Sequence, residues 1–186
     1  RAVLALEDSL LKQARAVMDR KIPMLRIRIH GDYHLGQVLF TGKDFVIVDL
    51  EGEPSRSLSE RRYKRSPLRD VAGMIRSFEY AAAYAIRHGP MRTEDIPALL
   101  PWARLWRRWA SASFLRGYFD AAGDAAYLPK GADAFAAMMD FYLLDKAIYE
   151  LRYELNNRPD WVGIPLEGIR RRLAAETERP SGAVAR

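Results

Sequence analysis

The stretch "RIRIHGDYHLGQVLF" (residues 26–40) places two histidines and an aspartate between two apolar runs. Before the polar residues, "LRIRI" (25–29) alternates apolar and basic side chains, which is typical of a short strand. After them, "QVLF" (37–40) and "FVIVDL" (45–50) are rich in apolar and β-branched residues. The "TGKD" between these two runs contains Gly42, which favours a tight turn. The stretch therefore predicts a polar loop that leads into a β-hairpin.

Helical patterns fill most of the remaining chain. Apolar residues recur at spacings of three and four over long segments, as they do in amphipathic helices. The expected helices are residues 2–20, 67–88, 93 to about 122, 131–157 and 165–178. Residues 50–65 show no clear period, and Pro54, three serines and a charge cluster predict a surface loop there. The predicted fold class is α+β, mostly α, with one small hairpin in a helical domain.

Composition narrows the class of protein. The chain has 186 residues, of which 49% are hydrophobic, so we expect one domain over residues 1–178 and a disordered tail over 179–186. No apolar run approaches the roughly 18 residues of a membrane-spanning helix, so no membrane segment is expected. The absence of cysteine excludes disulfides and thiolate zinc sites. A cytoplasmic location fits this composition.

The net charge is +6, and arginine supplies most of the positive charge. Such a balance is found in proteins that bind nucleic acids, phosphorylated ligands or acidic partners. The densest runs are "ERRYKR" (60–65), "RLWRRW" (104–109) and "IRRRL" (169–173), each short and mixed with apolar residues. We interpret them as solvated helix faces whose arginine stems cover apolar surface, and we expect no nucleic-acid partner.

The polar loop has the spacing of a kinase catalytic loop. Counted from His30, the residues follow H-x-D-x-x-x-x-[N/Q], with Asp32 as the acid and Gln37 as the amide. In the pattern H-R-D-x-x-x-x-N, the aspartate accepts the proton of the substrate hydroxyl and the amide oxygen binds a metal ion. Gln37 offers Mg²⁺ the same kind of hard oxygen as asparagine does.

A second carboxylate follows the hairpin. In Asp49-Leu50-Glu51-Gly52, Asp49 stands where a kinase places its other metal-binding aspartate, at the start of D-F-G. Because the turn sets the register of the hairpin, it fixes the distance between Asp32 and Asp49. The two motifs together predict phosphoryl transfer. The alternative is that Asp32 caps a turn and Asp49 ends a strand.

The two histidines have separate expected roles. His30 is expected to orient the loop through hydrogen bonds rather than to transfer a proton. His34 is expected either to contact a phosphate or a metal-bound water, or to serve the structure of the loop. The pair lies in a loop, and no glutamate occupies the position that the zinc motif H-E-x-x-H requires, so zinc is not expected.

The segment "HGDYHLGQVL" resembles the catalytic loop of aminoglycoside-phosphotransferase-like kinases, and more specifically that of bacterial maltokinases, which occur alone or fused to trehalose synthase. The resemblance continues in "VIVDLEGEPSRSLSERRYKRSPLRDVAGMIRSFEYAA" and "YELRYELNNRPDWVGIPL", and spans most of residues 26–166. It implies a two-lobed, protein-kinase-like fold. It also implies ATP-dependent phosphorylation of maltose at the anomeric hydroxyl, with maltose 1-phosphate and ADP as products.

The resemblance also implies roles for single residues. Asp32 matches the catalytic base, Gln37 and Asp49 match the Mg²⁺ ligands, and Glu51 is an acidic neighbour expected to add to the metal shell. Asp70 matches the residue that supports the catalytic loop from behind.

The family's N-terminal nucleotide-binding lobe has no counterpart in this chain. The chain begins at Arg1 inside a helical pattern, so we expect a C-terminal lobe that is part of something longer and phosphorylates poorly or not at all alone. The expected partners are ATP, maltose, the absent lobe and a trehalose synthase domain.

The long helix expected over 131–157 carries polar and aromatic residues on one face, at spacings of three and four. These residues are Lys146, Tyr149, Glu150, Tyr153 and Asn157, and Trp161 follows them. Such a face suits a sugar, which needs hydrogen-bonding side chains and an aromatic surface. The alternative is that the tyrosines are half-buried core and that Lys146 and Glu150 form an ion pair.

Three tryptophans share a face of the preceding helix. Trp102, Trp106 and Trp109 are spaced by four and three residues, and we interpret them as core packing rather than as a sugar platform.

Two other functions remain open at this point. One is a phosphotransferase of the same fold that acts on an aminoglycoside or an amino alcohol. The other is a non-catalytic helical module that binds a partner domain. A nucleic-acid binder is suggested only by the net charge, and it would show salt-sensitive affinity.

Overall fold

The computed structural model of the chain describes residues 10–11, 15 and 21–177. The helix expected over 2–20 therefore lies outside the described residues except at three positions, which are helical. The expected tail, 179–186, lies outside them altogether.

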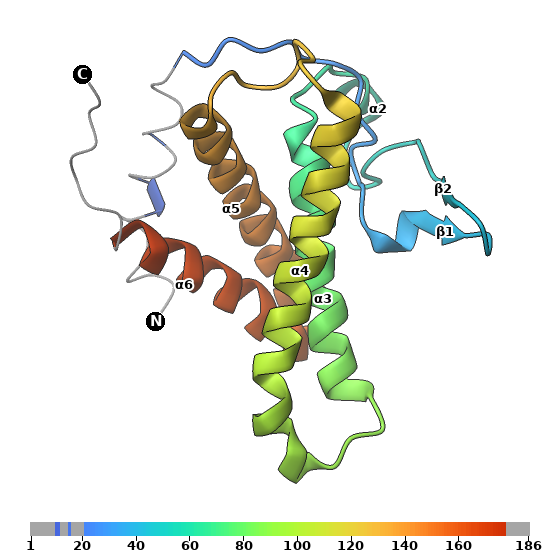
Figure 1. Cartoon of the computed structure of the whole chain (residues 1–186), viewed down its shortest axis with the longest axis vertical. Helices are drawn as coiled ribbons and strands as arrows, with labels where there is room; N and C mark the ends of the chain where they lie inside the picture. Colours follow the sequence, from blue (N-terminus) through green and yellow to red (C-terminus); the bar gives the residue numbers. More distant parts are fainter. Residues whose placement is uncertain (1–9, 12–14, 16–20, 178–186) are drawn as a thin grey trace.

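Long helices make up most of the described structure, and Figure 1 shows their arrangement. They are α3 (Leu68–His88), α4 (Ile96–Ala122), α5 (Ala132–Asn157) and α6 (Gly163–Thr177). The shorter elements are η2 (Leu35–Gln37), β1 (Val38–Phe40), β2 (Phe45–Ile47), α2 (Leu58–Arg61), η3 (Thr93–Asp95) and η4 (Pro159–Trp161). Helix α3 packs against α4 and α5, and α5 packs in turn against α6.

The core follows the apolar stripes of these helices. Its larger cluster joins α3 to α5 and consists of Leu68, Val71, Ala72, Ile75, Met139 and Leu143. Phe114, Leu115 and Tyr118 of α4 pack against this cluster. A second cluster, Leu144, Ala147, Ile169 and Leu173, joins α5 to α6. The rigid platform is therefore helical, and α3 lies at its centre.

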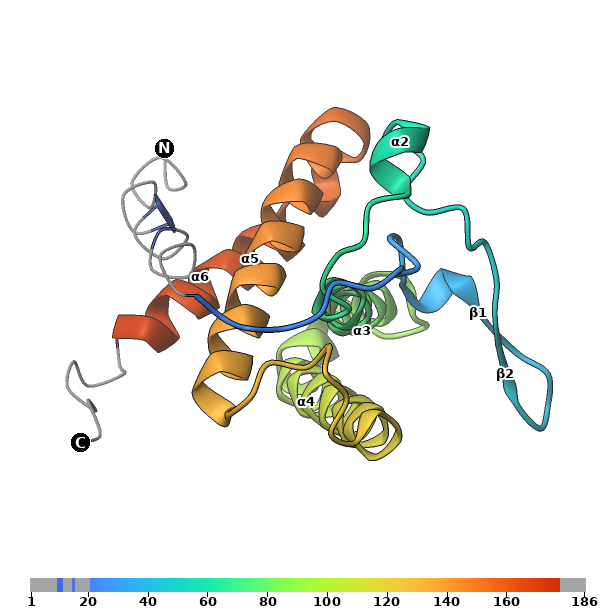
Figure 2. The ribbon, with the colours of Figure 1, turned by 90° about the horizontal axis from the view of Figure 1, so that it is seen from above.

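The hairpin forms as expected from its sequence, but it stands apart from the helices. β1 and β2 pair antiparallel, with Val38 opposite Ile47 and Phe40 opposite Phe45. Seen from above, the hairpin projects away from α5 and α6 (Figure 2). Its large apolar side chains are exposed, with Phe40 at 65% and Phe45 at 66%. The hairpin therefore presents apolar side chains that the described helices do not cover.

Two local expectations were wrong. Residues 25–29 form no regular strand, because the segment makes a single bridge, Ile27 to Arg65, before its backbone turns to other partners. Residues 50–65 contain the short helix α2, which a capping box stabilises: Ser57 and Glu60 each bond the backbone N–H of the other. The S-x-x-E signature of that box is visible in the sequence.

The tryptophans of α4 are not core residues. Trp102 and Trp109 are 68% and 67% exposed, and Trp106 is 48% exposed while it meets Phe78 edge-on. Another face of α4 packs against the core cluster through Phe114, Leu115 and Tyr118, and of the tryptophan face Trp106 is partly covered by Phe78 of α3. The interpretation of this face as packing was therefore wrong.

No helix in the described part of the chain combines the length and apolarity needed to cross a membrane.

Candidate active site

The loop that carries Asp32 is held on helix α3. The carboxylate of Asp70, in the first turn of α3, accepts the backbone N–H of His30 at 2.7 Å and that of Gly31 at 2.9 Å. Burial raises the pKa of Asp70 above its ordinary value, although both amide bonds oppose that shift. The structure thus places Asp70 directly behind the loop.

Two further positions on α3 bring the loop close. A Cβ at Gly73 would lie 2.6 Å from the carbonyl oxygen of Tyr33, so only glycine allows this approach without displacement. One turn later, the hydroxyl of Ser77 accepts the backbone N–H of Leu35 at 3.1 Å. The loop is therefore fixed at its start, middle and end by one helix.

Asp32 faces two cationic or polar partners. Its Oδ2 lies 3.7 Å from Nε2 of His34, and its Oδ1 lies 3.6 Å from Nζ of Lys146 on α5. The N–H group of His34 is the largest influence on the pKa of Asp32 and lowers it. Burial opposes this effect, Lys146 adds to it, and the pKa stays below its ordinary value. Asp32 is therefore a carboxylate at neutral pH.

The hydrogen bonds assign one tautomer to each histidine. Nδ1 of His30 accepts the N–H of Asp32 at 3.4 Å, so the proton is on Nε2, which donates to the carbonyl of Val48 at 2.9 Å. Nδ1 of His34 accepts the N–H of Gly36 at 3.0 Å, so its Nε2–H points at Asp32. His30 ties the loop to the end of the hairpin, while His34 reaches the carboxylate of Asp32.

Gln37 and Asp49 meet at the base of the hairpin. Nε2 of Gln37 donates to Oδ2 of Asp49 at 2.8 Å. Asp49 has a φ of 59°, a left-handed backbone that costs free energy in a residue with a side chain. Their amide and carboxylate oxygens are the hard donors that Mg²⁺ prefers, so this pair fits that ion.

Glu51 is exposed and does not join the pair that Gln37 forms with Asp49. No three His, Asp or Glu side chains converge on a metal position anywhere in the described chain.

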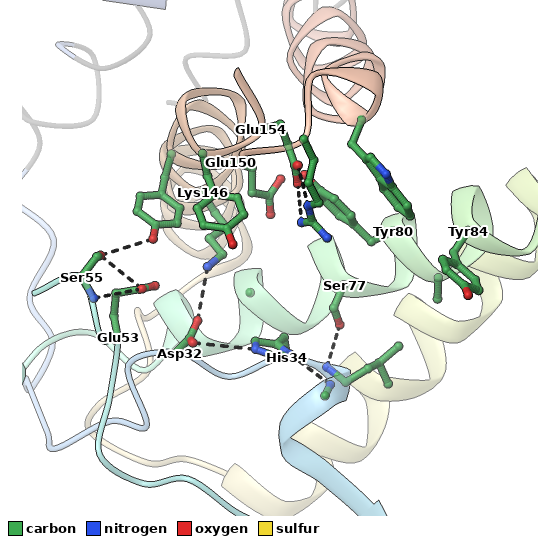
Figure 3. A pocket seen from close by; sticks show the side chains of 18 of the residues that line it. Asp32, His34, Glu53, Ser55, Ser77, Tyr80, Tyr84, Lys146, Glu150 and Glu154 are labelled. Carbon is green, nitrogen blue, oxygen red and sulfur yellow. Dashed lines mark hydrogen bonds and ion pairs between the residues drawn. The ribbon is translucent and has the colours of Figure 1, made fainter. Parts of the chain in front are cut away.

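A large pocket opens beside Asp32 and is shown in Figure 3. It has a volume of about 880 Å³, within the range of small-molecule sites. Of the residues that the sequence suggested, it is lined by Asp32, His34, Lys146, Tyr149, Glu150, Tyr153 and Trp161. Gln37, Asp49 and Asn157 do not line it, and the side chain of Asn157 instead donates to the carbonyl of Tyr153 on its own helix.

The sequence suggested that α5 carries either a sugar-binding face or half-buried tyrosines with a Lys146–Glu150 ion pair, and the structure matches neither interpretation completely. Lys146 and Glu150 form no ion pair with each other, since Lys146 approaches Asp32 and Glu150 binds Arg76 of α3. Glu150 is only 8% exposed, and burial raises its pKa despite Arg76. Tyr149 contacts Ser55 through their hydroxyls, 3.3 Å apart. Glu150, which lines the pocket, is therefore held in place by its ion pair with Arg76.

Glu150 belongs to a network of buried charged side chains that includes Arg76 and Glu79. Arg76 donates to Glu150 through Nε at 2.8 Å and also pairs with Glu79. Glu79 accepts from Arg107 of α4 at 2.9 Å and from Arg171 of α6 at 2.8 Å. Burial opposes ionisation of Glu79, but the three arginines hold its pKa below the ordinary value. Through Arg76, this carboxylate links all four long helices.

One wall of the pocket was not predicted from the sequence. Helix α3 contributes Tyr80 and Tyr84, and Trp161 stacks against both at centroid distances of 6.2 and 6.0 Å. The segment after the hairpin contributes Glu53 and Ser55. A signal was available, because Gly73, Ser77, Tyr80, Ala81 and Tyr84 follow each other at helical spacings on one face of α3.

The chain is similar to known sugar kinases. It is 29% identical over 145 residues to a glucosamine kinase of Streptacidiphilus jiangxiensis, and 31% identical over 141 residues to one of Mycolicibacterium smegmatis. These alignments cover 75% and 73% of the chain but only 30% and 32% of the relatives. The chain therefore spans about a third of the length of the curated relatives it matches. No family model matches it.

Solved structures show the same fold. A glucosamine kinase in complex with glucosamine, ADP and inorganic phosphate superposes with a TM-score of 0.74 at 21% identity, covering 95% of the chain and 42% of that protein. A second crystal form of a glucosamine kinase also gives 0.74, covering 94% of the chain and 40% of that protein. The chain has the fold of one part of a glucosamine kinase.

Proposed function

We propose that this chain is the catalytic and acceptor-binding part of a sugar kinase, which transfers a phosphoryl group from ATP to a sugar hydroxyl. The observation that carries the proposal is the position of Asp32. Its ionised carboxylate faces a pocket large enough for a sugar, on a loop that α3 holds at three points. The similarity to glucosamine kinases supports the same reaction class.

The residues of this chain divide the chemistry between them. Asp32 accepts the proton of the attacking hydroxyl, as the matching aspartate does in kinases. His34 and Lys146 keep it ionised, and Lys146 places a positive charge beside the reacting atoms. Gln37 and Asp49 would hold Mg²⁺, which neutralises phosphate charge when it is bound. His30 and Asp70 orient the loop and touch no substrate.

The acceptor we favour is an amino sugar such as glucosamine. Glu53 and Glu150 present carboxylates in the pocket, and a carboxylate can accept from an ammonium group as well as from hydroxyls. The stacked Tyr80, Tyr84 and Trp161 offer the apolar surface that a sugar ring covers. Maltose is the second candidate, because the pocket extends from Asp32 to Trp161 and the opening motif resembles that of maltokinases.

We further propose that the nucleotide is held mainly by a lobe outside these residues. The exposed apolar side chains of the hairpin support this, because Leu39, Phe40 and Phe45 would be covered by a lobe placed over Gln37 and Asp49. On this proposal the 186-residue chain alone phosphorylates poorly, while a longer protein that carries it behind a nucleotide-binding lobe is active.

The test is ADP formation from Mg²⁺-ATP, measured in parallel with glucosamine, glucose, maltose and an aminoglycoside. The chain and the longer protein are assayed side by side. Sugar-dependent ADP from the longer protein only is the expected result, and the preferred sugar decides between the two acceptors. Activity with the aminoglycoside alone would replace the sugar with a cationic acceptor. No acceptor-dependent ADP from either protein would favour the non-catalytic helical module.

A further inference from the structure

A second, much smaller cavity lies against the loop that carries Asp32. Its volume is about 20 Å³, enough for one water-sized group. Gly31 of the catalytic loop and Gly52 after the hairpin form part of its wall. Half of the remaining wall is arginine, namely Arg56, Arg61, Arg65 and Arg69, and the other half is Ile29, Glu53, Glu60 and Tyr63. Two of the four arginines belong to "ERRYKR", the run whose composition suggested a solvated face.

The arginines of this wall lack the carboxylate partners that other arginines of the fold have. Arg76, Arg107 and Arg171 all pair with Glu79, whereas none of the four wall arginines makes an ion pair within the described residues. The two wall carboxylates accept from serines: Glu60 from Ser57, and Glu53 from Ser55. Hydrogen bonds from Ser57 lower the pKa of Glu60 most, and the nearby charges of Arg56 and Arg65 lower it further, so the wall holds four arginines but only two carboxylates.

The side chains of the wall differ in what they already bind. Arg61 donates to the carbonyls of Arg56 and Pro54, at 2.9 and 2.8 Å, and so shapes the segment that closes the cavity. Arg69 is half-buried: burial and then the charge of Arg56 lower its pKa, while Asp145 and Asp70 raise it. An anion bound between Arg56 and Arg69 would offset the repulsion between these two like charges.

One donor in the wall is buried and without an acceptor. Nε of Arg56 is shielded from solvent and has no hydrogen-bond partner among the described residues. An unpaired buried donor is rare in folded proteins, and an anion bound beside it would supply the missing acceptor. A guanidinium group matches the oxygens of a phosphoryl group in paired hydrogen bonds.

We propose that Arg56, Arg65 and Arg69 bind the terminal phosphoryl group of a small molecule, or inorganic phosphate, at this cavity. The narrow volume admits only part of such a group, so the rest of any larger ligand remains at the mouth. The two cavities share Glu53, but Lys146 and Arg158 line only the Asp32 pocket and the four arginines line only this one. The proposal does not depend on the sugar kinase reaction.

The experiment is a calorimetric titration of the protein with inorganic phosphate at constant ionic strength, without nucleotide or sugar. A parallel titration with glucose 6-phosphate distinguishes free phosphate from a phosphorylated metabolite. The double variant Arg56→Gln/Arg69→Gln is expected to weaken phosphate binding at least about tenfold. The matched control, Arg116→Gln/Arg170→Gln, removes the same charge from exposed helix positions and is expected to bind as the wild type does.

Two more variants keep the outcome decisive. Arg69→Lys keeps the charge and the fold but loses the guanidinium fork, so it is expected to show a partial loss of binding. Lys146→Gln is expected to leave phosphate binding unchanged. No saturable binding by the wild type, equal binding by the Arg56/Arg69 variant, or loss of binding in Lys146→Gln alone would each overturn the proposal. The last result would place the phosphate in the Asp32 pocket.

Discussion

Removing the carboxylate of Asp70 tests whether helix α3 holds the catalytic loop. In Asp70→Ala, the N–H groups of His30 and Gly31 lose an ionised acceptor that lies 2.7 and 2.9 Å away. A hydrogen bond to a charged group contributes about 1.5–3 kcal/mol, and water can enter the space that the substitution leaves. We therefore expect the free energy of unfolding to fall by about 3 kcal/mol, the low end for two such bonds.

The assay is urea unfolding at neutral pH, followed by far-UV circular dichroism. Asp70→Asn keeps one acceptor oxygen, so it is expected to lose about half as much stability. Asp95→Ala serves as the control, because its carboxylate pairs with the exposed Arg92, and it is expected to lose less than about 1 kcal/mol. If Asp70→Ala unfolds at the same urea concentration as Asp95→Ala, the carboxylate does not hold the loop.

Three further substitutions test other parts of the site. Gly73→Ala puts a methyl group 2.6 Å from the carbonyl oxygen of Tyr33, so sugar-dependent ADP formation is expected to fall about tenfold or more while the circular dichroism spectrum stays helical. The control is Gly117→Ala, whose methyl group meets nothing within 4 Å, and equal activity of the two variants would contradict the steric argument. His34→Gln removes the largest influence that lowers the pKa of Asp32, so the acid limb of the pH–rate profile is expected to move to higher pH. An acid limb at the wild-type pH would show that His34 does not control the protonation of the catalytic base. Glu79→Gln leaves the charges of its arginine partners uncompensated, so the free energy of unfolding in urea is expected to fall by about 3–5 kcal/mol. A fall of less than about 1 kcal/mol would contradict this role of Glu79.

Elements with strong local signals could be predicted from the sequence. The helix expected over 67–88 lies between Pro67 and Gly89-Pro90, and the observed α3 begins one residue later than expected and ends at the expected residue. The hairpin was visible because two β-branched runs flank a glycine turn, and its strands are confirmed. The short α2 was missed although its capping box can be read locally, because the surrounding serines and charges also suit a loop.

What depends on packing between distant segments could not be predicted in the same way. The tryptophan face of α4 has the spacing of a core stripe, but which face is buried depends on where α3 lies. Likewise, the spacing of α5 suggested a Lys146–Glu150 pair, whereas each residue binds a group brought in by another element. The i, i+3 spacing of Arg76 and Glu79 permits their pairing, but the rest of their network could not be predicted because its members come from three other helices.

The loop brings Asp32 to the pocket and joins Gln37 to Asp49, the residues that the kinase spacing singled out. Asp70, which the family resemblance singled out, lies behind the backbone of that loop. Glu51 and Asn157 lie apart from these groups.

The most direct test of Asp32 as the catalytic base is a single-turnover measurement of phosphoryl transfer from ATP to the preferred sugar by the longer protein, with Asp32→Asn beside Asp120→Asn. Asp120 is an exposed aspartate of α4, so its variant controls for loss of one carboxylate. We predict that Asp32→Asn slows transfer by about 10²–10⁴-fold, the typical contribution of a general base, while Asp120→Asn matches the wild type. Transfer by Asp32→Asn at the wild-type rate would contradict the assignment of Asp32 as the catalytic base.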